Sequence, residues 1–503
     1  MPMPTLVLAT TATAMNRSHW ILVAVLTAGA GGFVWANRQA GLEIAAAIAE
    51  QQAYIARQPW LRVVSQTYER GIFTSTAVVT LEPRGVLGEV LGLNRSTATP
   101  DKLPPRIVYR HEIRHGPLPN WRQGNFTLAR AVVETRFRGD GSLAGLLPEL
   151  FGPTAAALLV TEFSDDRNGI AKLRLPAISR YLSDNAKLTW QGLSGEIRFS
   201  RAYDRVNASL AMPTLDLTAK DSRASLHGAR LQADLRLGAH GVWLGTAEAK
   251  TDKLSLTWPG QSVAVSGVGH RSEVTETGDF LDVSSRITAR GIVSKSEKAG
   301  PVELSFSLRH LHGPSIRTLR EAIEGLPARR LKPEAEVLEQ QTLGRAFMND
   351  LLSRQPELRI DALNVRMPAG ELRLTLALRV LDYDAEVATP IDTLDGVEID
   401  LDIDVSEALL LAVAEQAASR FGKSPTLGME GVPAETEQRA PRAVTELIDG
   451  LVSKGRLVRD GEWLTANLRW REGGLKINGL SVDSAIPKFS APDSPVFALP
   501  ASD

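Results

Sequence analysis

The sequence contains no cysteine among its 503 residues. This absence excludes disulfide bonds, thiolate zinc sites, iron–sulfur clusters held by cysteine and a cysteine nucleophile. The chain also lacks an excess of either charge, since 57 Lys and Arg residues stand against 58 Asp and Glu residues and the net charge is -1. Without surplus positive charge it has little with which to neutralise a nucleic-acid backbone, so nucleic acid is not an expected partner.

Motifs of two common enzyme classes are missing as well. There is no G-x-S-x-G nucleophile elbow. There is no glycine-rich phosphate loop either, because Gly29, Gly31 and Gly32 lie inside an apolar run, where small residues permit close helix packing. No cofactor is predicted. The hydrophobic content of 43% nevertheless allows a sizeable core, so a folded chain is expected.

The long apolar run is Trp20–Ala36, which contains no charged residue. Its 17 residues cover about 25 Å as a helix, and with its flanks it is long enough to span a membrane. Arg17 precedes it, as expected on the cytoplasmic side of an anchor. A cleaved signal peptide is the alternative, because Ala28–Ala30 and Val34–Ala36 resemble cleavage sites. The favoured interpretation is an uncleaved transmembrane helix within residues 15–37.

The segments on either side of this run bear on that interpretation. Residues 1–14 form an uncharged leader, which is unusual ahead of an anchor, so Met15 is the predicted translation start and Met1 is the alternative. Residues 38–59 are rich in alanine, with apolar residues near helical spacing, and predict a juxtamembrane helix. That helix either lifts the rest of the chain off the membrane or packs on it as a cap, and the sequence leaves both open.

After residue 60 the hydrophobic period changes from helical to two. Phe73–Glu82 alternates, with Thr80 and Glu82 on the predicted wet face. Similar alternation recurs in Val302–Leu308, Leu372–Val380 and Val397–Val405. This pattern indicates antiparallel sheet with one solvated side. We therefore predict an α+β fold, predominantly antiparallel β-sheet with several helices, and an N-terminal transmembrane helix.

Helical periodicity returns in two places. Ser315–Glu324 and Pro333–Ser353 are amphipathic, and a proline suits the first turn of the second helix. Ser406–Phe421 and Pro441–Ser453 form the other pair, on either side of a predicted mobile loop, Gly422–Ala440. Whether the strand-rich portions form one sheet or two domains stays open. The predicted division is 1–14 leader, 15–37 anchor, 38–59 juxtamembrane helix, 60–310 strand-rich region, 311–355 helical segment, 356–405 strands, 406–454 helices with loop 422–440, and 455–503 terminal hairpin and tail.

The string His111–His115 (HEIRH) matches H-E-x-x-H, in which a helix brings two histidines to one zinc and the glutamate activates its water. However, Arg106–Arg114 alternates like a strand, and Gly116–Pro117 would end a helix at the second histidine. On a strand the two histidines stand about 13 Å apart, too far for one ion. We therefore predict neither a metal site nor an enzyme. The residues of the zinc-peptidase alternative are His111, Glu112, His115 and, as third ligand, Glu134.

Several short segments, in this order and spacing, resemble the signature segments of the YdgA-like family. The segments are Tyr68–Ser75 (YERGIFTS), His115–Leu118 (HGPL), Trp243–Gly245, Leu351–Gly370 and Lys476–Gly479 (KING). The matching positions are Tyr68, Arg70, Gly71, Phe73, Ser75, His115, Gly116, Pro117, Gly245, Asn478 and Gly479. The resemblance implies a single bacterial inner-membrane anchor with the bulk of the chain in the periplasm, and it carries over no catalytic residue. The uncharged leader and the loop at Gly422–Ala440 depart from the family.

These patterns predict a place and an architecture rather than an activity. The favoured function is a non-enzymatic, membrane-anchored periplasmic envelope protein that binds lipid or a protein partner through a long β-sheet surface. A structural or assembly factor that acts as an oligomer, through helices such as Pro333–Ser353, is one alternative, and the zinc-dependent peptidase is the other. The expected partners are the inner membrane through Trp20–Ala36, lipid or envelope proteins, and a second copy of the chain.

Overall fold

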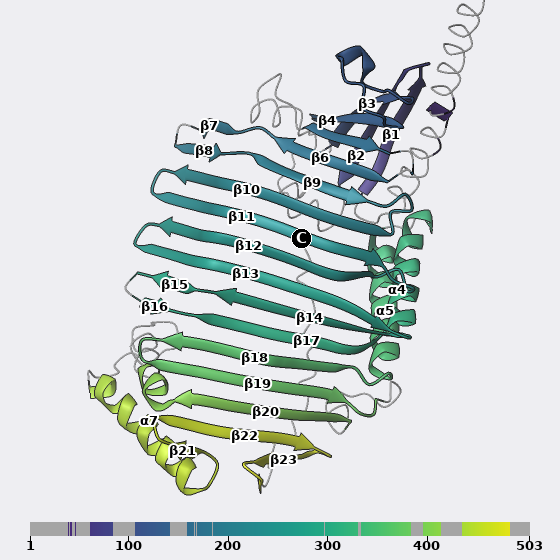
Figure 1. Cartoon of the computed structure of the whole chain (residues 1–503). Coiled ribbons are helices and arrows are strands. Elements are labelled where there is room, and N and C mark those ends of the chain that lie inside the picture. The colour runs from purple at the N-terminus through teal and green to yellow at the C-terminus, as the bar shows by residue number, and fades with distance from the viewer. Residues whose placement is uncertain are drawn as a thin grey trace, which may run out of the picture. The chain divides into compact units, whose positions relative to one another are not determined.

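The protein is β-rich, with a large antiparallel sheet and a few helices (Figure 1). The computed structural model describes residues 61–83, 106–140, 158–164, 166, 168–183, 185–295, 297–329, 333–383, 396–413 and 435–482, together with Gln39, Gly41, Leu42 and Ala46. The strands pair with their neighbours in antiparallel fashion. The predicted antiparallel β-sheet with helices is therefore confirmed.

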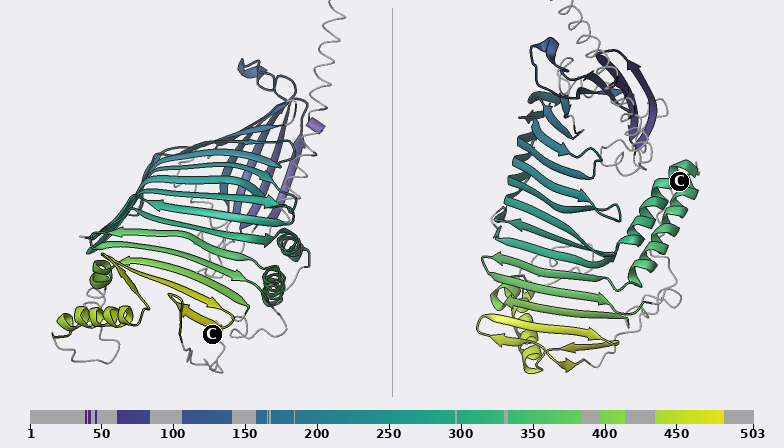
Figure 2. Two further views of the ribbon diagram at one scale, coloured as in Figure 1. Left: turned by 60° about the horizontal axis from the view of Figure 1, so that its bottom comes forward. Right: turned by 45° about the vertical axis from the view of Figure 1, so that its right-hand side comes forward.

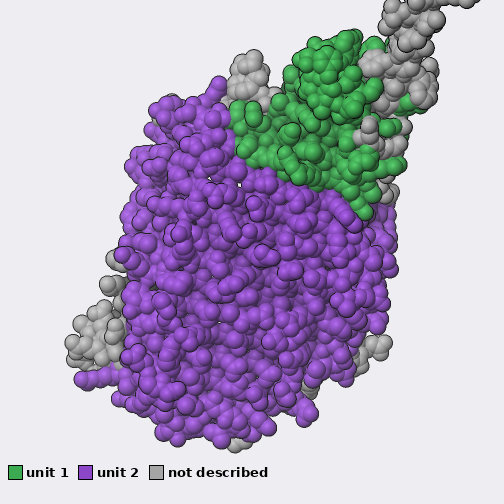
Figure 3. Space-filling model, in the orientation of Figure 1, with its two compact units in different colours: residues 1–176, 193–204 green, residues 177–192, 205–503 purple. Residues whose placement is uncertain are grey.

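The chain forms two compact units, which Figure 3 shows in different colours. Unit 1 comprises residues 1–176 and 193–204, and unit 2 comprises residues 177–192 and 205–503. The predicted strand-rich region 60–310 is divided between the two. Along the chain, residues 177–192 form a hairpin that belongs to unit 2, and the chain then returns to unit 1 for that unit's last strand, within residues 193–204.

The strands of unit 1 pair in the order β1-β2-β3-β4-β5-β6-β9. They are β1 (Leu61–Arg70), β2 (Thr74–Pro83), β3 (Arg106–His115), β4 (Ala131–Asp140), β5 (Leu158–Phe163), β6 (Gly169–Leu175) and β9 (Leu193–Phe199). A short 3-10 helix, η2 (Trp121–Gln123), lies in the connection between β3 and β4. The segment Tyr68–Ser75, which carries part of the family resemblance, spans the end of β1 and the start of β2.

One face of the unit 1 sheet is a well-packed core. Alternate residues of β2 and their partners on β3 point to it, and Ala77, Val79 and Ile113 are 0%, 1% and 0% exposed. The opposite face of β2 differs from the prediction, because Thr80 and Glu82 are buried rather than wet. Burial of the carboxylate is accommodated by the Arg62 guanidinium, which lies 2.6 Å from Glu82.

Unit 2 is built on a longer sheet, paired in the order β7-β8-β10-β11-β12-β13-β14-β17-β18-β19-β20-β22-β23-β24. Its strands are β7 (Ile178–Ser183), β8 (Ala186–Trp190), β10 (Arg205–Ala219), β11 (Ser222–Leu237), β12 (Trp243–Trp258), β13 (Gln261–Thr277), β14 (Phe280–Ala289), β15 (Gly291–Ser294), β16 (Glu297–Ala299), β17 (Val302–His312), β18 (Glu357–Met367), β19 (Gly370–Val380), β20 (Val397–Ser406), β21 (Val458–Asp460), β22 (Trp463–Arg471), β23 (Gly474–Ile477) and β24 (Leu480–Ser481). The strands predicted from alternation correspond to β17, β19 and β20, and β22 with β23 forms the predicted terminal hairpin.

The helices of unit 2 lie at the ends of its strands. Figure 2 shows the sheet as a single layer, with α4 (Gly313–Gly325) and α5 (Pro333–Leu352) side by side next to one end of it. These two helices confirm the predicted helices in the 311–355 segment, and a 3-10 turn, η4 (Leu326–Arg329), follows α4. Because the strands cross the unit from end to end, helices placed there leave the middle of the sheet uncovered by them.

The third helix, α7 (Glu435–Ser453), begins earlier than predicted. The sequence-based start at Pro441 is wrong, and the predicted loop Gly422–Ala440 therefore ends before residue 435. The segment ahead of the proline, ETEQRA, consists mostly of good helix formers. The helix therefore begins before Pro441, which lies inside it. The partner helix predicted at Ser406–Phe421 is helical over residues 407–413, and residues 414–421 lie outside the described part.

Several predictions concern segments that the structure does not describe. The leader, the predicted span Trp20–Ala36 and the tail beyond residue 482 lie outside the described residues. Of the predicted juxtamembrane helix 38–59, Gln39, Gly41, Leu42 and Ala46 are described, and all four are helical. Among the helices of the described ranges, none is both long enough and apolar enough to cross a membrane.

Candidate functional site

The main candidate site is one face of the unit 2 sheet, which we call the apolar face. Strand register places three rows of directly paired residues across ten strands, from β10 to β22. Residues two apart on a strand point to the same side, so the rows share a face. The rows are Leu210, Leu231, Ala249, His270, Ile287, Leu304, Leu363, Leu374, Ile403 and Ala466; Ala208, Ala233, Ala247, Ser272, Ser285, Phe306, Ile360, Leu376, Leu401 and Leu468; and Val206, Leu235, Gly245, Val274, Val283, Leu308, Leu358, Leu378, Ile399 and Trp470.

The composition of these rows is almost wholly apolar. They contain no Asp, Glu, Lys or Arg, and their polar side chains are His270, Ser272 and Ser285. The imidazole Nε2 of His270 lies 2.9 Å from the Ser285 hydroxyl, so these two groups satisfy each other. A β-bulge in β18, between Ile360 and Leu363, keeps the apolar residues of that strand in phase with β17 and β19. The face is therefore continuous across the strands.

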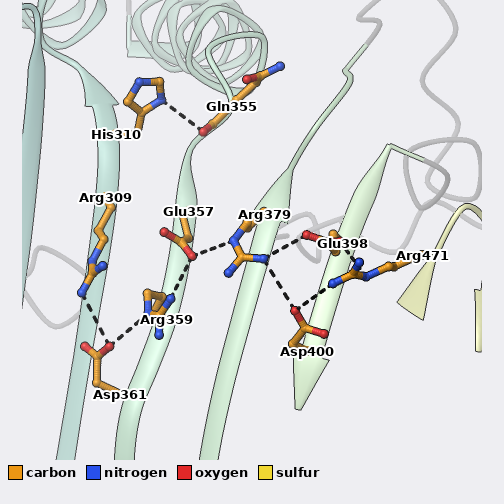
Figure 4. Close-up of polar contacts among 10 residues, drawn as sticks. All are labelled: Arg309, His310, Gln355, Glu357, Arg359, Asp361, Arg379, Glu398, Asp400 and Arg471. Atoms are coloured by element: carbon orange, nitrogen blue, oxygen red, sulfur yellow. Dashed lines mark hydrogen bonds and ion pairs between the residues drawn. The ribbon is translucent and has the colours of Figure 1, made fainter. Parts of the chain in front are cut away.

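The opposite face of the same strands carries the charges. Figure 4 shows ion pairs that run from strand to strand along it. Arg379 on β19 lies 2.9 Å from Glu357 on β18 and 2.9 Å from Glu398 on β20. Arg471 on β22 continues the chain of contacts at 2.7 Å from Glu398. The hydrogen bonds that Arg379 donates to Glu398 and Glu357 raise its pKa above the ordinary value. The sheet is thus strongly two-sided.

The apolar face is covered at one corner. There Val405 and Leu464, one row beyond the three, pack with Leu409 from residues 407–413 and with Ile448 of α7. Under this cover Leu464 is 0% exposed and Ile448 is 3% exposed. This corner shows that residues of the apolar face become ordinary core wherever a helix lies on them.

Elsewhere the apolar face is open to solvent in the part of the chain that the structure describes. Leu231 and Ile287 are each 39% exposed, although both are on strands that are paired on either side. None of the hydrophobic side chains in the three rows is fully buried. Monomeric soluble proteins seldom expose an apolar patch larger than a few hundred Å², so a face of this extent is the main candidate site of the described residues.

The motif positions of the sequence analysis are distributed over both units. In unit 1, Ser75 and His115 are buried and lie 3.1 Å apart, from the Ser75 hydroxyl to the imidazole Nε2. The Tyr68 hydroxyl donates to the Gly41 carbonyl at 3.4 Å, and an ideal Cβ on Gly41 would lie 3.0 Å from the His115 ring. Tyr68, Ser75 and His115 therefore meet around one glycine of the N-terminal helical segment.

The other motif positions occupy turns and close contacts. Arg70 ends β1, Gly71 follows it, and the Phe73 ring lies 5.4 Å from the Arg122 guanidinium. Gly116 has a φ of 109°, and the carbonyl of Pro117 accepts a hydrogen bond from Ala129. These residues lie where β1 ends, where β2 begins and where β3 ends, and the structure does not bring them into one pocket.

In unit 2 the motif positions are also structural. Gly245 has a φ of 116°, and a Cβ there would lie 2.2 Å from the Asp234 carbonyl oxygen. Asn478 precedes Gly479 in the turn after β23, and its side-chain oxygen accepts a hydrogen bond from the Asn467 amide at 2.8 Å. A backbone position with a positive φ favours glycine or asparagine, which explains glycine at position 245 and asparagine at position 478.

The H-E-x-x-H string lies on strand β3, as the alternation predicts. The two histidines share one face of β3, whereas Glu112 points to the other face, where it is paired with Glu134 of β4. His111 hydrogen-bonds the Thr135 hydroxyl at 2.7 Å, and Glu134 pairs with Arg114 at 2.8 Å. The zinc-peptidase residues therefore do not converge. Within the described ranges, no group of three or more His, Asp or Glu side chains is arranged to hold a metal ion.

Sequence reasoning identified a long sheet surface but not the residues that form it. Alternation is visible in Val206–Met212 (VNASLAM) and Leu231–Leu237 (LQADLRL), and this signal would have placed the first two strands of the apolar face. The hydrogen-bonded pair of His270 and Ser285 left no such signal, because it depends on the register between β13 and β14.

The fold and the apolar face define a β-rich protein with an open hydrophobic sheet surface and no assembled catalytic site among the described residues. The chain belongs to a family of bacterial proteins of unknown function, DUF945, whose family model matches residues 15–484. No curated protein and no solved structure matches the chain. Membership of a family of unknown function is consistent with a sequence that predicts no particular activity. The likeness to the YdgA-like family stays a prediction.

Proposed function

We propose that this protein is a membrane-anchored periplasmic envelope protein that binds the hydrocarbon chains of lipids on the apolar face of unit 2. The observation that carries the proposal is the set of three uncharged rows across ten strands, in which Leu231 and Ile287 are each 39% exposed. Burial of such side chains against hydrocarbon is favourable by about 25 cal/mol per Å². The proposal assigns no catalytic residue and no cofactor.

The dimensions of the apolar face support hydrocarbon as the ligand. Ten strands at a spacing of about 4.8 Å extend over roughly 43 Å. The hydrocarbon of one bilayer leaflet is about 15 Å thick, half of the roughly 30 Å core, so an acyl chain fits across a few strands. The apolar face therefore has room for more than one lipid chain.

The chemistry of the apolar face favours lipid over a protein partner. Even the buried centre of a protein interface is only about 65% apolar and is surrounded by a polar rim. The three rows, in contrast, carry no charged residue, and the hydroxyl of Ser285 is already paired with His270. A hydrocarbon chain needs no hydrogen-bonding partner and accepts such a surface.

The membrane part of the proposal rests on the sequence. Trp20–Ala36 is uncharged and is preceded by Arg17, the arrangement of an anchor whose C-terminal side leaves the cytoplasm. The resemblance to the YdgA-like family supports the same orientation. An anchored protein with an apolar face would hold a lipid chain beside the membrane from which that chain came.

Native mass spectrometry of the full chain after mild detergent extraction tests the proposal. We expect phospholipid to co-purify with the protein, and Ile287→Glu to lower the bound lipid at least about tenfold, since that factor needs only about 1.4 kcal/mol. The matched control is Ser284→Glu, on the same strand β14 but on the charged face, which should retain lipid. Absence of lipid from the wild-type chain, or equal loss in both variants, contradicts the proposal.

An assembly factor that acts as an oligomer is the second candidate. On helix α5 the side chains of Val337, Leu338 and Met348 are 53%, 64% and 46% exposed. Large apolar side chains exposed together on one helix are unusual unless another protein binds there. The same spectra distinguish the two functions, because a dimer or a bound protein that disappears in Leu338→Ser supports assembly through α5. Lipid retained by Leu338→Ser supports the apolar face as the site.

A further inference from the structure

A second exposed surface of unit 2 lies at the ends of four neighbouring hairpins. Figure 1 shows the hairpins β7–β8, β10–β11, β12–β13 and β15–β16 ending along one edge of the sheet, opposite the end occupied by α4 and α5. The hairpins are adjacent because β8 pairs with β10, β11 with β12, and β13 with β15. We call this surface the hairpin edge, defined by residues 178–190, 214–227, 253–266 and 291–299.

The hairpin edge exposes large apolar side chains from each hairpin. Leu254, Leu256 and Trp258 follow one another on alternate positions of β12 and are 38%, 43% and 37% exposed. Tyr181 of β7 is 73% exposed, and its ring lies under the Lys187 ammonium group at 5.6 Å. Tryptophan and tyrosine are the residues that settle at the headgroup level of a membrane, where one part of the side chain is apolar and the other is wet.

The charge of the hairpin edge differs from that of the whole chain. Its residues include seven basic and four acidic side chains, whereas the net charge of the chain is -1. Among the basic residues, Lys220 and Lys295 are exposed at turns, and Lys253 is exposed on β12, paired with His227 and Ser266. Lysines beside exposed aromatic and leucine side chains are the combination that binds a lipid surface with anionic headgroups.

We propose that the hairpin edge rests on a membrane surface with anionic headgroups and lets lipid chains reach the apolar face. The inference deepens the proposed function and rests on it. Strands β10, β11, β12 and β13 end at the hairpin edge, and the same four strands hold the first four residues of each apolar row. The hairpin edge and the apolar face therefore belong to one set of strands. Charge complementarity selects a lipid surface as the occupant of this edge.

A fluorescence measurement on the full chain tests the inference. The protein has no cysteine, so Gln261→Cys gives one labelling site beside Trp258, to which Gln261 is paired. The labelled chain is reconstituted into vesicles of phosphatidylcholine with phosphatidylglycerol that contain a nitroxide-labelled lipid, and more of the same vesicles are added. We expect the nitroxide to quench the label, and quenching to be much weaker in phosphatidylcholine alone.

Variants and a control site make this measurement decisive. Lys220→Glu with Lys253→Glu should weaken the contact with anionic vesicles at least about tenfold, and Trp258→Ser with Leu256→Ser should weaken it to a similar degree. A label at Leu338→Cys on α5, which is exposed but far from the hairpins along the sheet, should escape quenching. Absence of quenching at residue 261, or quenching that the charge reversals leave unchanged, overturns the inference.

The outcome is separable from that of the proposed function. Charge reversal at Lys220 and Lys253 leaves the apolar rows intact, so lipid that co-purifies with the protein should remain. Unquenched label together with co-purified phospholipid would reject the hairpin edge and keep the apolar face. Quenched label without co-purified phospholipid would retain a membrane contact and reject the proposed function on which the inference rests.

Discussion

The inner face of unit 1 and the apolar face of unit 2 are built from the same alternation of apolar and polar residues, yet they differ in burial. Ile113 on β3 of unit 1 is 0% exposed, and Ile287 on β14 of unit 2 is 39% exposed. Val79 and Tyr109 of unit 1 likewise belong to a packed cluster. The same strand pattern therefore makes a core in one unit and an open surface in the other.

The difference teaches that alternation indicates which side of a sheet is apolar, but not what covers that side. Among the described residues of unit 2, helical cover lies at the corner where α7 packs, and there Leu464 is as buried as any residue of unit 1. The three apolar rows have the composition of a core, but their hydrophobic side chains are only partly buried. A ligand with apolar chains would complete that core, and this is the physical basis of the proposed function.

The same substitution in the two units gives the largest expected contrast. Ile113→Ala should destabilise unit 1 by about 4 kcal/mol, because it leaves a cavity in a packed core. Ile287→Ala should cost unit 2 less than about 1 kcal/mol, because solvent or a flexible ligand fills the space. Hydrogen exchange measured on peptides from each unit reports the two free energies separately. Equal losses would mean that the apolar face is as well packed as the unit 1 core.

The pH dependence of unit 1 is the next largest effect. Burial lowers the pKa of His111 from its ordinary value of 6.5 to about 4. Between these two values the unfolded chain binds the proton and the folded one does not, so the stability is complete above pH 6.5 and falls as the pH approaches 4. The full shift corresponds to at most about 3 kcal/mol.

Hydrogen exchange of unit 1 peptides at pH 7 and pH 4.5 measures this loss, after correction for intrinsic exchange rates. His111→Gln, which can still hydrogen-bond the Thr135 hydroxyl, is the control and should show a much smaller loss. An unchanged pH dependence in that variant would assign the effect to other groups.

A glycine of unit 2 tests how far the open sheet relies on its backbone. Gly245→Ala should destabilise unit 2 by about 2 kcal/mol, because the residue has a φ of 116° and its Cβ would meet the Asp234 carbonyl oxygen at 2.2 Å. Gly260→Ala is the matched control, with a φ of 72° and nothing within 4 Å of the Cβ, and should cost about 1 kcal/mol. Urea titration followed by circular dichroism measures both. A smaller effect at Gly245 would show that the sheet tolerates local opening.

Much of this fold follows from local sequence patterns. Alternation predicted β17, β19 and β20, and it placed His111–His115 on a strand although the string suggests a helix. Local patterns succeeded because each strand shows its own two faces in its own residues.

The remaining features depend on contacts between distant residues. The three apolar rows exist only in the register of ten strands, and the burial of Glu82 depends on Arg62 twenty residues earlier. The start of α7 was missed because a proline suits the first turn of a helix but also tolerates an interior position at a cost. The exposure of Ile287 cannot be predicted from alternation, since the pattern is the same with or without a covering layer.

The smallest expected effect lies on the charged face of unit 2, and it completes the comparison between the two sides of that sheet. Arg379→Met removes hydrogen bonds to Glu357 and Glu398 at a partly exposed site, so the loss of stability should be about 1 kcal/mol and should shrink in high salt. Arg286→Met loses a single ion pair, with Glu303, at a more exposed site, so its loss of stability should be smaller. Urea titrations at low and high salt measure both. Neither variant should alter the bound lipid, because each cation faces away from the apolar rows; lipid lost from Arg379→Met with its stability intact would place the binding site on the charged face instead.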